Sequence, residues 1–154
     1  MSQIEDKLSA MGCALPTPPA PLANYIPGYR AGNMVFLSGV GPRSTDGTSI
    51  IGKLGQDLTV EQGYEAARLC ALNLLANLKS IIGDLDNVKH IAKVLGMVNS
   101  TPDFGQQPEV INGCSDLLVE AFGEKGRHGR SAVGMAALPR GIAVEIEMIV
   151  EVEE

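Results

Sequence analysis

The chain lacks the residues on which several classes of protein depend. It contains no tryptophan, and aromatic residues make up 4% of its 154 positions. Its two histidines show no HExxH or HxH spacing and its cysteines form no CxxC pair, so the usual sequence patterns of metal sites are absent. No phosphate-loop motif occurs either. We therefore expect no metal and no organic cofactor.

Positive charge is also scarce. Twelve Lys and Arg residues face 18 Asp and Glu residues, which gives a net charge of −6 and a pI near 4.9. Such a chain does not attract nucleic acid or an anionic membrane by general electrostatics. The few aromatic residues also offer little for base stacking. We expect neither nucleic acid nor a membrane as a partner.

The three cysteines are too few and too widely spaced to form a disulfide framework. Cys13, Cys70 and Cys114 are odd in number, and the last two fall on apolar faces of expected helices. We expect reduced, buried thiols that fill the core, which is typical of a cytoplasmic protein. The N-terminus carries no basic segment followed by an apolar run, so we expect no exported leader.

The length and the 45% apolar content suit one compact domain. Residues 2–11 have the apolar spacing of a short helix, and a proline-rich stretch follows that cannot continue it. We expect residues 1–21 to form an N-terminal helix and Pro-rich linker, an appendage to the core. Residues 22–154 are expected to form a single domain.

The remaining pattern predicts two strands, a helix, a strand, a helix and two strands. Strands are expected over 24–30 and 34–39, a helix from the Thr59 cap to Gly83, a strand over 88–98, and a helix between Pro108 and Gly123. Two final strand-like runs flank Leu138-Pro139, and we expect them to form a hairpin. This order predicts an α+β fold with a mixed sheet packed on two helices.

Three segments resemble the Rid/YjgF family, the reactive intermediate deaminases long labelled endoribonuclease L-PSP. In family order they are Gly32-Asn33-Met34-Val35-Phe36-Leu37-Ser38-Gly39, Pro108-Glu109-Val110-Ile111-Asn112, and Arg130-Ser131 with Leu138-Pro139 and Val144-Glu145-Ile146-Glu147. The resemblance covers about residues 24–153. It implies a chorismate-mutase-like (bacillus type) sandwich, assembled as a homotrimer with ligand clefts between subunits.

The resemblance also implies two catalytic residues. Arg130 matches the arginine that binds the substrate carboxylate, a role suited to a planar guanidinium that a lysine does not reproduce. Glu145 matches the glutamate that positions or activates the hydrolytic water, and we expect burial and Arg130 to tune its pKa. Glu147 shares its face of an ideal strand, so the pattern alone leaves both open.

Further cleft residues follow from the same comparison. Tyr25 aligns with the family's N-terminal cleft tyrosine, with Tyr29 as the alternative. Ser38 and Gly39 match a strand-end pair that contacts the ligand, and Asn112 falls where many members carry a helix asparagine near the cleft. These are the expected substrate-binding residues, together with Arg130.

The chain departs from the family pattern in places that matter for chemistry. Ala132 stands where many members carry a cysteine, so a thiol nucleophile is excluded there. His128, near Arg130, is either a cleft residue or a solvated loop histidine beside Arg127, and we favour the solvated histidine. No serine has a histidine partner visible in the sequence. With the N-terminal extension, these differences indicate a divergent branch.

Three functions compete. The resemblance implies a cofactor-free hydrolytic deaminase that takes reactive imine or enamine carboxylates to ammonia and a keto product. The alternative is a protein that binds a small carboxylate metabolite without turnover. An endoribonuclease ranks last, because the chain is acidic and poor in aromatics.

Overall fold

The computed structural model describes residues 2–20 and 24–154. The elements along the chain are α1 (Gln3–Ala10), β1 (Gly28–Ala31), β2 (Met34–Val40), α2 (Val60–Ile82), η1 (Leu85–Asn87), β3 (Val88–Asn99), α3 (Gln107–Phe122), η2 (Gly123–Gly126), β4 (Gly129–Met135), η3 (Pro139–Gly141) and β5 (Val144–Val152). The strands form one sheet in the order β1-β2-β5-β3-β4. Among the described strands, only the β3–β4 pair is parallel.

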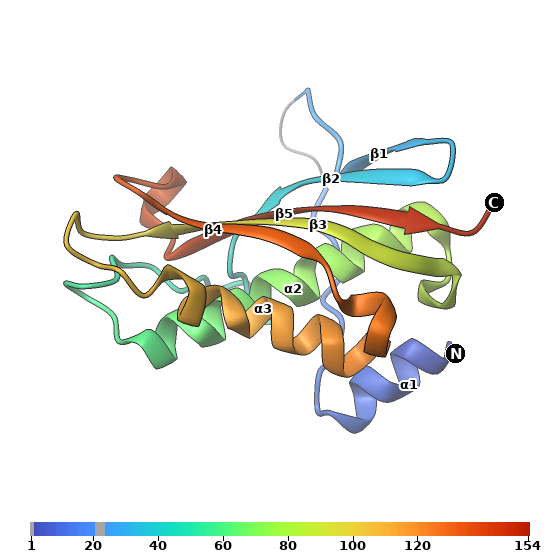
Figure 1. Ribbon diagram of the computed structural model, residues 1–154, viewed down its shortest axis with the longest axis horizontal. Helices are drawn as coiled ribbons and strands as arrows, with labels where there is room; N and C mark the ends of the chain where they lie inside the picture. Colours follow the sequence, from blue (N-terminus) through green and yellow to red (C-terminus); the bar gives the residue numbers. More distant parts are fainter. Residues whose placement is uncertain (1, 21–23) are drawn as a thin grey trace.

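Helices α2 and α3 cover one face of the sheet, and the other face carries no helix in the part of the chain that the structure describes (Figure 1). The predicted α+β fold with a mixed sheet on two helices is confirmed. The core lies between the layers and includes alternate residues of β5, from Val144 to Val152, that point toward the helices.

The predicted C-terminal hairpin is wrong. Strand β5 does not pair with β4 but lies between β2 and β3, antiparallel to both, while β4 adds to the far edge of β3. With a strand on each side, β5 has ladder partners for its backbone groups along both edges, and its alternate apolar side chains reach the centre of the core. The turn η3 therefore joins two strands that are not neighbours.

The helix ends agree with the sequence pattern. Thr59 and Gln62 form a reciprocal capping box at the start of α2, and Gly83 ends the helix with a positive φ of 84°. The two long helices pack closely where α3 carries Gly113. A Cβ built on Gly113 would lie 2.0 Å from the carbonyl oxygen of Tyr64, so this crossing requires glycine.

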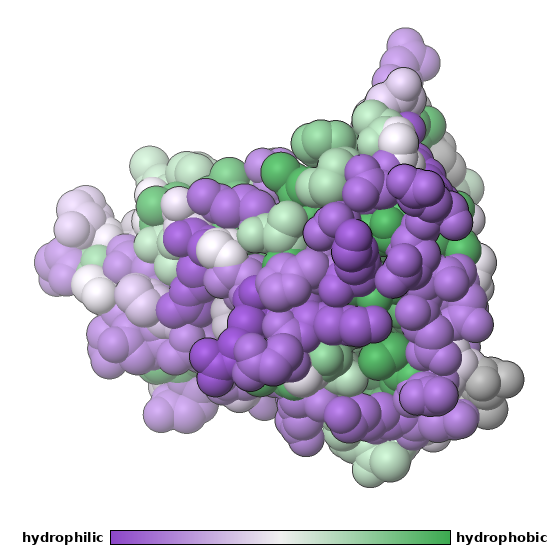
Figure 2. Space-filling view, turned by 45° about the vertical axis from the view of Figure 1, so that its right-hand side comes forward, coloured by the Kyte–Doolittle hydropathy of each residue, from purple (hydrophilic) through white to green (hydrophobic). Residues whose placement is uncertain are grey.

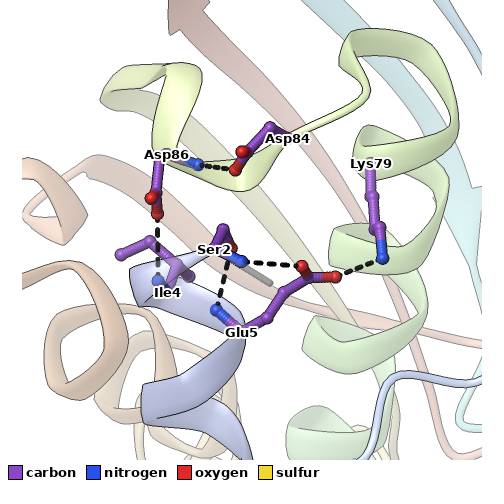
Figure 3. A network of polar contacts seen from close by, with 6 residues as sticks. All are labelled: Ser2, Ile4, Glu5, Lys79, Asp84 and Asp86. Carbon is purple, nitrogen blue, oxygen red and sulfur yellow. Dashed lines mark hydrogen bonds and ion pairs between the residues drawn. The ribbon is translucent and has the colours of Figure 1, made fainter.

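Helix α1 is not an appendage, because its apolar side chain enters the common core. Leu8 is 1% exposed and belongs to the main hydrophobic cluster. Asp86 of η1 accepts hydrogen bonds from the backbone N–H groups of Gln3 (2.9 Å) and Ile4 (3.0 Å), which satisfies free donors at the helix start. Glu5 forms an ion pair with Lys79 of α2 (Figure 3). The expected boundary at residues 21 and 22, and Pro21 of the linker, lie outside the described residues.

Strand β1 begins at Gly28 rather than at residue 24. The preceding segment is instead tied to the end of β2, where Ser38 N–H donates to the Pro27 carbonyl at 2.9 Å. No described helix has the length and apolar character needed to cross a membrane. Hydrophilic side chains cover most of the surface seen in Figure 2, and hydrophobic groups show between them.

Candidate functional site

Arg130 lies on the edge strand β4, beside α3. Its Nη1 donates to the Ser115 hydroxyl at 3.0 Å and its Nη2 to the Pro108 carbonyl at 3.4 Å. The guanidinium borders an open hollow of about 540 Å³, which we call the Arg130 hollow. Asn112, another expected binding residue, lines the same hollow. Ser115 and Pro108 accept from two of the five N–H groups of the guanidinium, a planar donor group of the kind that matches a carboxylate.

Ser115 and His128 complete a hydrogen-bonded chain in this hollow. The His128 Nδ1 lies 2.6 Å from the Gly126 carbonyl oxygen, and its Nε2 lies 2.9 Å from the Ser115 hydroxyl. A carbonyl oxygen only accepts, so Nδ1 carries the proton and, in the neutral ring, Nε2 accepts from Ser115. Burial lowers the pKa of His128 below its usual 6.5, and the charges of Arg130 and His90 lower it further. The expectation of a solvated loop histidine is therefore wrong.

Tyr25, Ser38 and Gly39 line a second hollow of about 320 Å³, the Tyr25 hollow, at the end of β2. The Ser38 hydroxyl donates to the Ile26 carbonyl at 2.6 Å, which holds the segment that carries Tyr25 against the strand. Tyr25 is 55% exposed. Tyr29, the alternative, lies on β1 opposite Phe36 and does not line this hollow.

Glu145 of β5 lies against Gly39. A Cβ built on Gly39 would be 3.3 Å from the Glu145 carboxyl group, so a larger residue there would crowd the carboxylate. Burial raises the pKa of Glu145 above its usual 4.5, and the negative charge of Glu147 adds to the shift. Glu147 itself is exposed. Arg130, expected to help tune this pKa, is not among the causes.

Arg130 and Glu145 lie on opposite faces of the sheet. Arg130 pairs with Val94, which is fully buried under the helices, whereas Glu145 pairs with Met97. Positions 94 and 97 of one strand point to opposite sides, because side chains alternate. Within one chain the expected site residues thus form two separate groups, with Arg130 and Asn112 in one and Tyr25, Ser38, Gly39 and Glu145 in the other.

Ser115 was not among the residues predicted from the sequence, and His128 was favoured as a solvated loop residue, although a signal for both was present. Ser115 follows Asn112 by three residues on α3, which places both on one helix face. His128 precedes Arg130 by two residues, the spacing that puts side chains on one side of an extended backbone. Ser115 thus lies at helical spacing from the predicted Asn112, and His128 lies at strand spacing from the predicted Arg130.

Cys13, Cys70 and Cys114 line neither the Arg130 hollow nor the Tyr25 hollow. All three are free and buried, as expected. Burial raises the pKa of Cys114 to about 12 and that of Cys70 well above its usual value, so neither is a thiolate at neutral pH. Across residues 2–20 and 24–154, no group of three or more His, Cys, Asp or Glu side chains is placed to hold a metal ion.

Comparison with known proteins identifies the family. A family model described as YjgF/chorismate mutase-like, which also carries the endoribonuclease label, matches residues 5–151. The chain belongs to the Rid/YjgF family. The match begins inside α1, so it includes most of the N-terminal helix together with the sheet and both long helices.

The relatives differ in how similar they are to this chain in sequence and in structure. Protein TCP17 of Trypanosoma cruzi is 43% identical over 150 residues, which cover 97% of this chain and 94% of the relative. The crystal structure of Atu1372 from Agrobacterium tumefaciens, of unknown function, has a TM-score of 0.91 at 41% identity, covering 98% of this chain and 92% of the other. RidA from Psychrobacter has a TM-score of 0.59 at 25% identity, covering 88% and 94%. The chain is thus nearer in structure to Atu1372 than to RidA.

Proposed function

We propose that this protein is a cofactor-free hydrolytic deaminase of reactive imine or enamine carboxylates, which releases ammonia and a keto product. The observation that supports this most is Arg130, a cation that is held by the Ser115 hydroxyl and the Pro108 carbonyl and that lines an open hollow. Two parallel N–H donors match a carboxylate in charge and shape. Membership of the family that includes RidA supports the same reading.

In this proposal, assembly of several copies of the chain brings Arg130 of one copy close to Glu145 of another. The open face of the sheet exposes large apolar side chains, among them Tyr29 (64%), Phe36 (46%) and Val133 (39%). Burying such a face against copies of the chain removes apolar area from water. In a homotrimer, the Arg130 hollow of one copy would meet the Tyr25 hollow and Glu145 of the next. Each cleft then contains a cation, a carboxylate and a tyrosine.

The chemistry needs little more than orientation. The imine carbon is already electrophilic, so the site has to hold the carboxylate and position one water molecule near that carbon. Glu145 is suited to activate this water, since its raised pKa brings it nearer to neutral pH while leaving a basic carboxylate. This account requires no metal or organic cofactor, and the three buried thiols suit the reducing cytoplasm.

The test is an assay that generates the imine in place. An amino-acid oxidase produces 2-imino acids from several amino acids, and ammonia release is followed with and without this protein. We expect faster release with the protein, and no acceleration with Arg130→Ala. Release at the rate of buffer alone for every imine tried would reject the deaminase.

A second function is favoured by Ala132. This residue lies two positions after Arg130, where the sheet side that faces the site offers a methyl group and no reactive atom. The protein would then bind a small carboxylate metabolite in the same cleft without turning it over. Calorimetry with stable carboxylates, in a preparation that shows no turnover, distinguishes this function. The endoribonuclease reading stays last, because a net charge of −6 opposes binding to RNA.

A further inference from the structure

Strand β4 offers the proposed site no proton-transfer group of its own. Around Arg130 it carries Gly129, Ser131 and Ala132, none of which titrates near neutral pH. Release of ammonia nevertheless needs a proton delivered to the leaving nitrogen. In the Arg130 hollow, a chain of hydrogen bonds runs from the Gly126 carbonyl through His128 and Ser115 to Arg130. His128 is the titratable group in this chain that is hydrogen-bonded to Ser115, whose hydroxyl lies beside the proposed carboxylate anchor.

We propose that Ser115, backed by His128, transfers the proton that releases ammonia from the intermediate. This inference rests on the proposed deaminase function and assigns a further catalytic residue to it. Ser115 is placed for the task because its hydroxyl oxygen lies 3.0 Å from the guanidinium that would hold the substrate carboxylate. In a 2-imino acid the imine carbon is bonded directly to the carboxylate, so a carboxylate held by Arg130 would bring that carbon close to Ser115.

The geometry is that of an activated hydroxyl with an oriented base. His128 accepts at Nε2 from Ser115, and its other nitrogen is fixed by the Gly126 carbonyl, so the ring cannot change tautomer without losing a hydrogen bond. A nucleophile or proton carrier, a base within hydrogen-bond reach and a third group that orients the base are the parts that such chemistry requires. Arg130 favours negative charge developing on the Ser115 oxygen.

The charges around His128 keep it available as a base. Its pKa is lowered by burial, so the ring is neutral near pH 7. The groups that face the hollow from the surrounding elements are Asp116 and Glu120 on α3, Arg127 before β4 and Arg130 on β4, and His90 on β3 adds a weaker charge effect. Asp116 and Glu120 would stabilise the imidazolium that forms during transfer, whereas the arginines and His90 return it to the neutral form.

The proton moves in a cycle that leaves Ser115 and His128 unchanged. Glu145 of the neighbouring copy assists addition of water to the imine, which gives an intermediate that carries a hydroxyl and an amino group on one carbon. The hydroxyl proton passes to the Ser115 oxygen as the Ser115 proton passes to His128 Nε2. The proton then passes from His128 through Ser115 to the amino nitrogen of the intermediate. The oxygen electron pair forms the C=O bond as the C–N bond breaks with its electron pair on that protonated nitrogen, so the products are the keto acid and ammonia.

The experiment compares Ser115→Ala and His128→Gln with wild type in the imine assay. Ser131→Ala is the matched control, since Ser131 follows Arg130 directly but faces the opposite side of the sheet. We expect kcat to fall on the order of 10- to 100-fold in both test variants, with calorimetric affinity for a stable carboxylate within about threefold of wild type. Ser131→Ala should retain wild-type kcat.

The pH profile separates proton transfer from a structural role. Wild-type activity should fall as pH drops through the pKa of His128, measured by NMR on a chain with two histidines and assigned with His90→Gln. That limb should be missing in His128→Gln. Unchanged kcat in both test variants overturns the proposal but leaves the deaminase function in place. Weakened carboxylate affinity at unchanged kcat also overturns it, because Ser115 would then only hold Arg130 in position. Absence of turnover by wild type removes the proposal and the deaminase together.

Discussion

Arg130 and Glu145 project from opposite faces of one five-stranded sheet. Arg130 shares the helix-covered side with Val94, and Glu145 shares the open side with Met97. A cation that holds a carboxylate and a base that activates water cannot meet on one substrate from these positions in a single chain. The proposed activity therefore depends on contact between copies, and the predictions below follow from this division.

The Arg130 guanidinium should be required for binding and not for folding. Arg130→Ala should weaken binding of a small carboxylate by roughly 2–5 kcal/mol, because the charge-assisted contacts are lost. Arg130→Lys should restore only part of that affinity, since an ammonium lacks the planar fork. Calorimetry measures both. Arg30→Ala is the control, as Arg30 is an exposed arginine on β1 that donates to the Gly32 carbonyl (2.9 Å) and does not line the Arg130 hollow. Equal affinity of wild type and Arg130→Ala would reject the anchor.

Glu145 should carry catalysis, and Glu147 should not. Glu145→Gln keeps the size of the side chain but removes the base, so kcat should fall about 100-fold while carboxylate binding persists. Glu147→Gln is the matched control on the same face of β5, and we expect its kcat within a few-fold of wild type. A larger loss in Glu147→Gln than in Glu145→Gln would reverse the assignment.

The raised pKa of Glu145 also predicts a pH effect on stability. Because the folded-state pKa lies above the unfolded value of about 4.5, the folded chain binds protons more tightly, and stability is lost as pH rises through the folded pKa. Glu145→Gln should therefore raise the melting temperature at pH 7, and the difference should vanish below about pH 4.5. Thermal unfolding at several pH values measures this. A destabilised Glu145→Gln at pH 7 would contradict it.

Helix α1 should be part of the stable core. Leu8→Ala should reduce the free energy of unfolding by about 2–5 kcal/mol, because it opens a cavity in a fully packed cluster. Ser9→Ala, at an exposed position of the same helix, is the control. Asp86→Ala should speed hydrogen exchange at the Gln3 and Ile4 amides, which lose their acceptor. Slow exchange at these amides in the variant would show that the cap does not hold the helix.

Local features could be predicted from the sequence, and strand pairing could not. The Thr59 cap, the Gly83 stop and the helix after Pro108 depend on neighbours within four residues, and the structure has them where the pattern placed them. The C-terminal hairpin failed because a Leu-Pro turn favours local pairing, while β5 is buried more completely between β2 and β3. Only long-range packing decides between these arrangements.

In the candidate site too, local features could be predicted from the sequence and long-range contacts could not. The family motif predicted Arg130 and Glu145 as site residues. Showing that they lie on opposite faces of the sheet required the order and register of the strands, together with the alternation of side chains along each strand. The Ser115–His128 contact joins α3 to the start of β4, so no local pattern contains it. Asp86 likewise caps a helix more than eighty residues away in the sequence.

The most direct test of a site shared between copies is complementation. Arg130→Ala and Glu145→Gln should each be nearly inactive alone. After dissociation and reassembly of an equal mixture, about a quarter of the clefts would combine an intact Arg130 from one copy with an intact Glu145 from the next, since each occurs with a chance of one half in a cyclic trimer. We predict that ammonia release recovers to about a quarter of the wild-type rate. A reassembled mixture as inactive as its separate components would contradict the account.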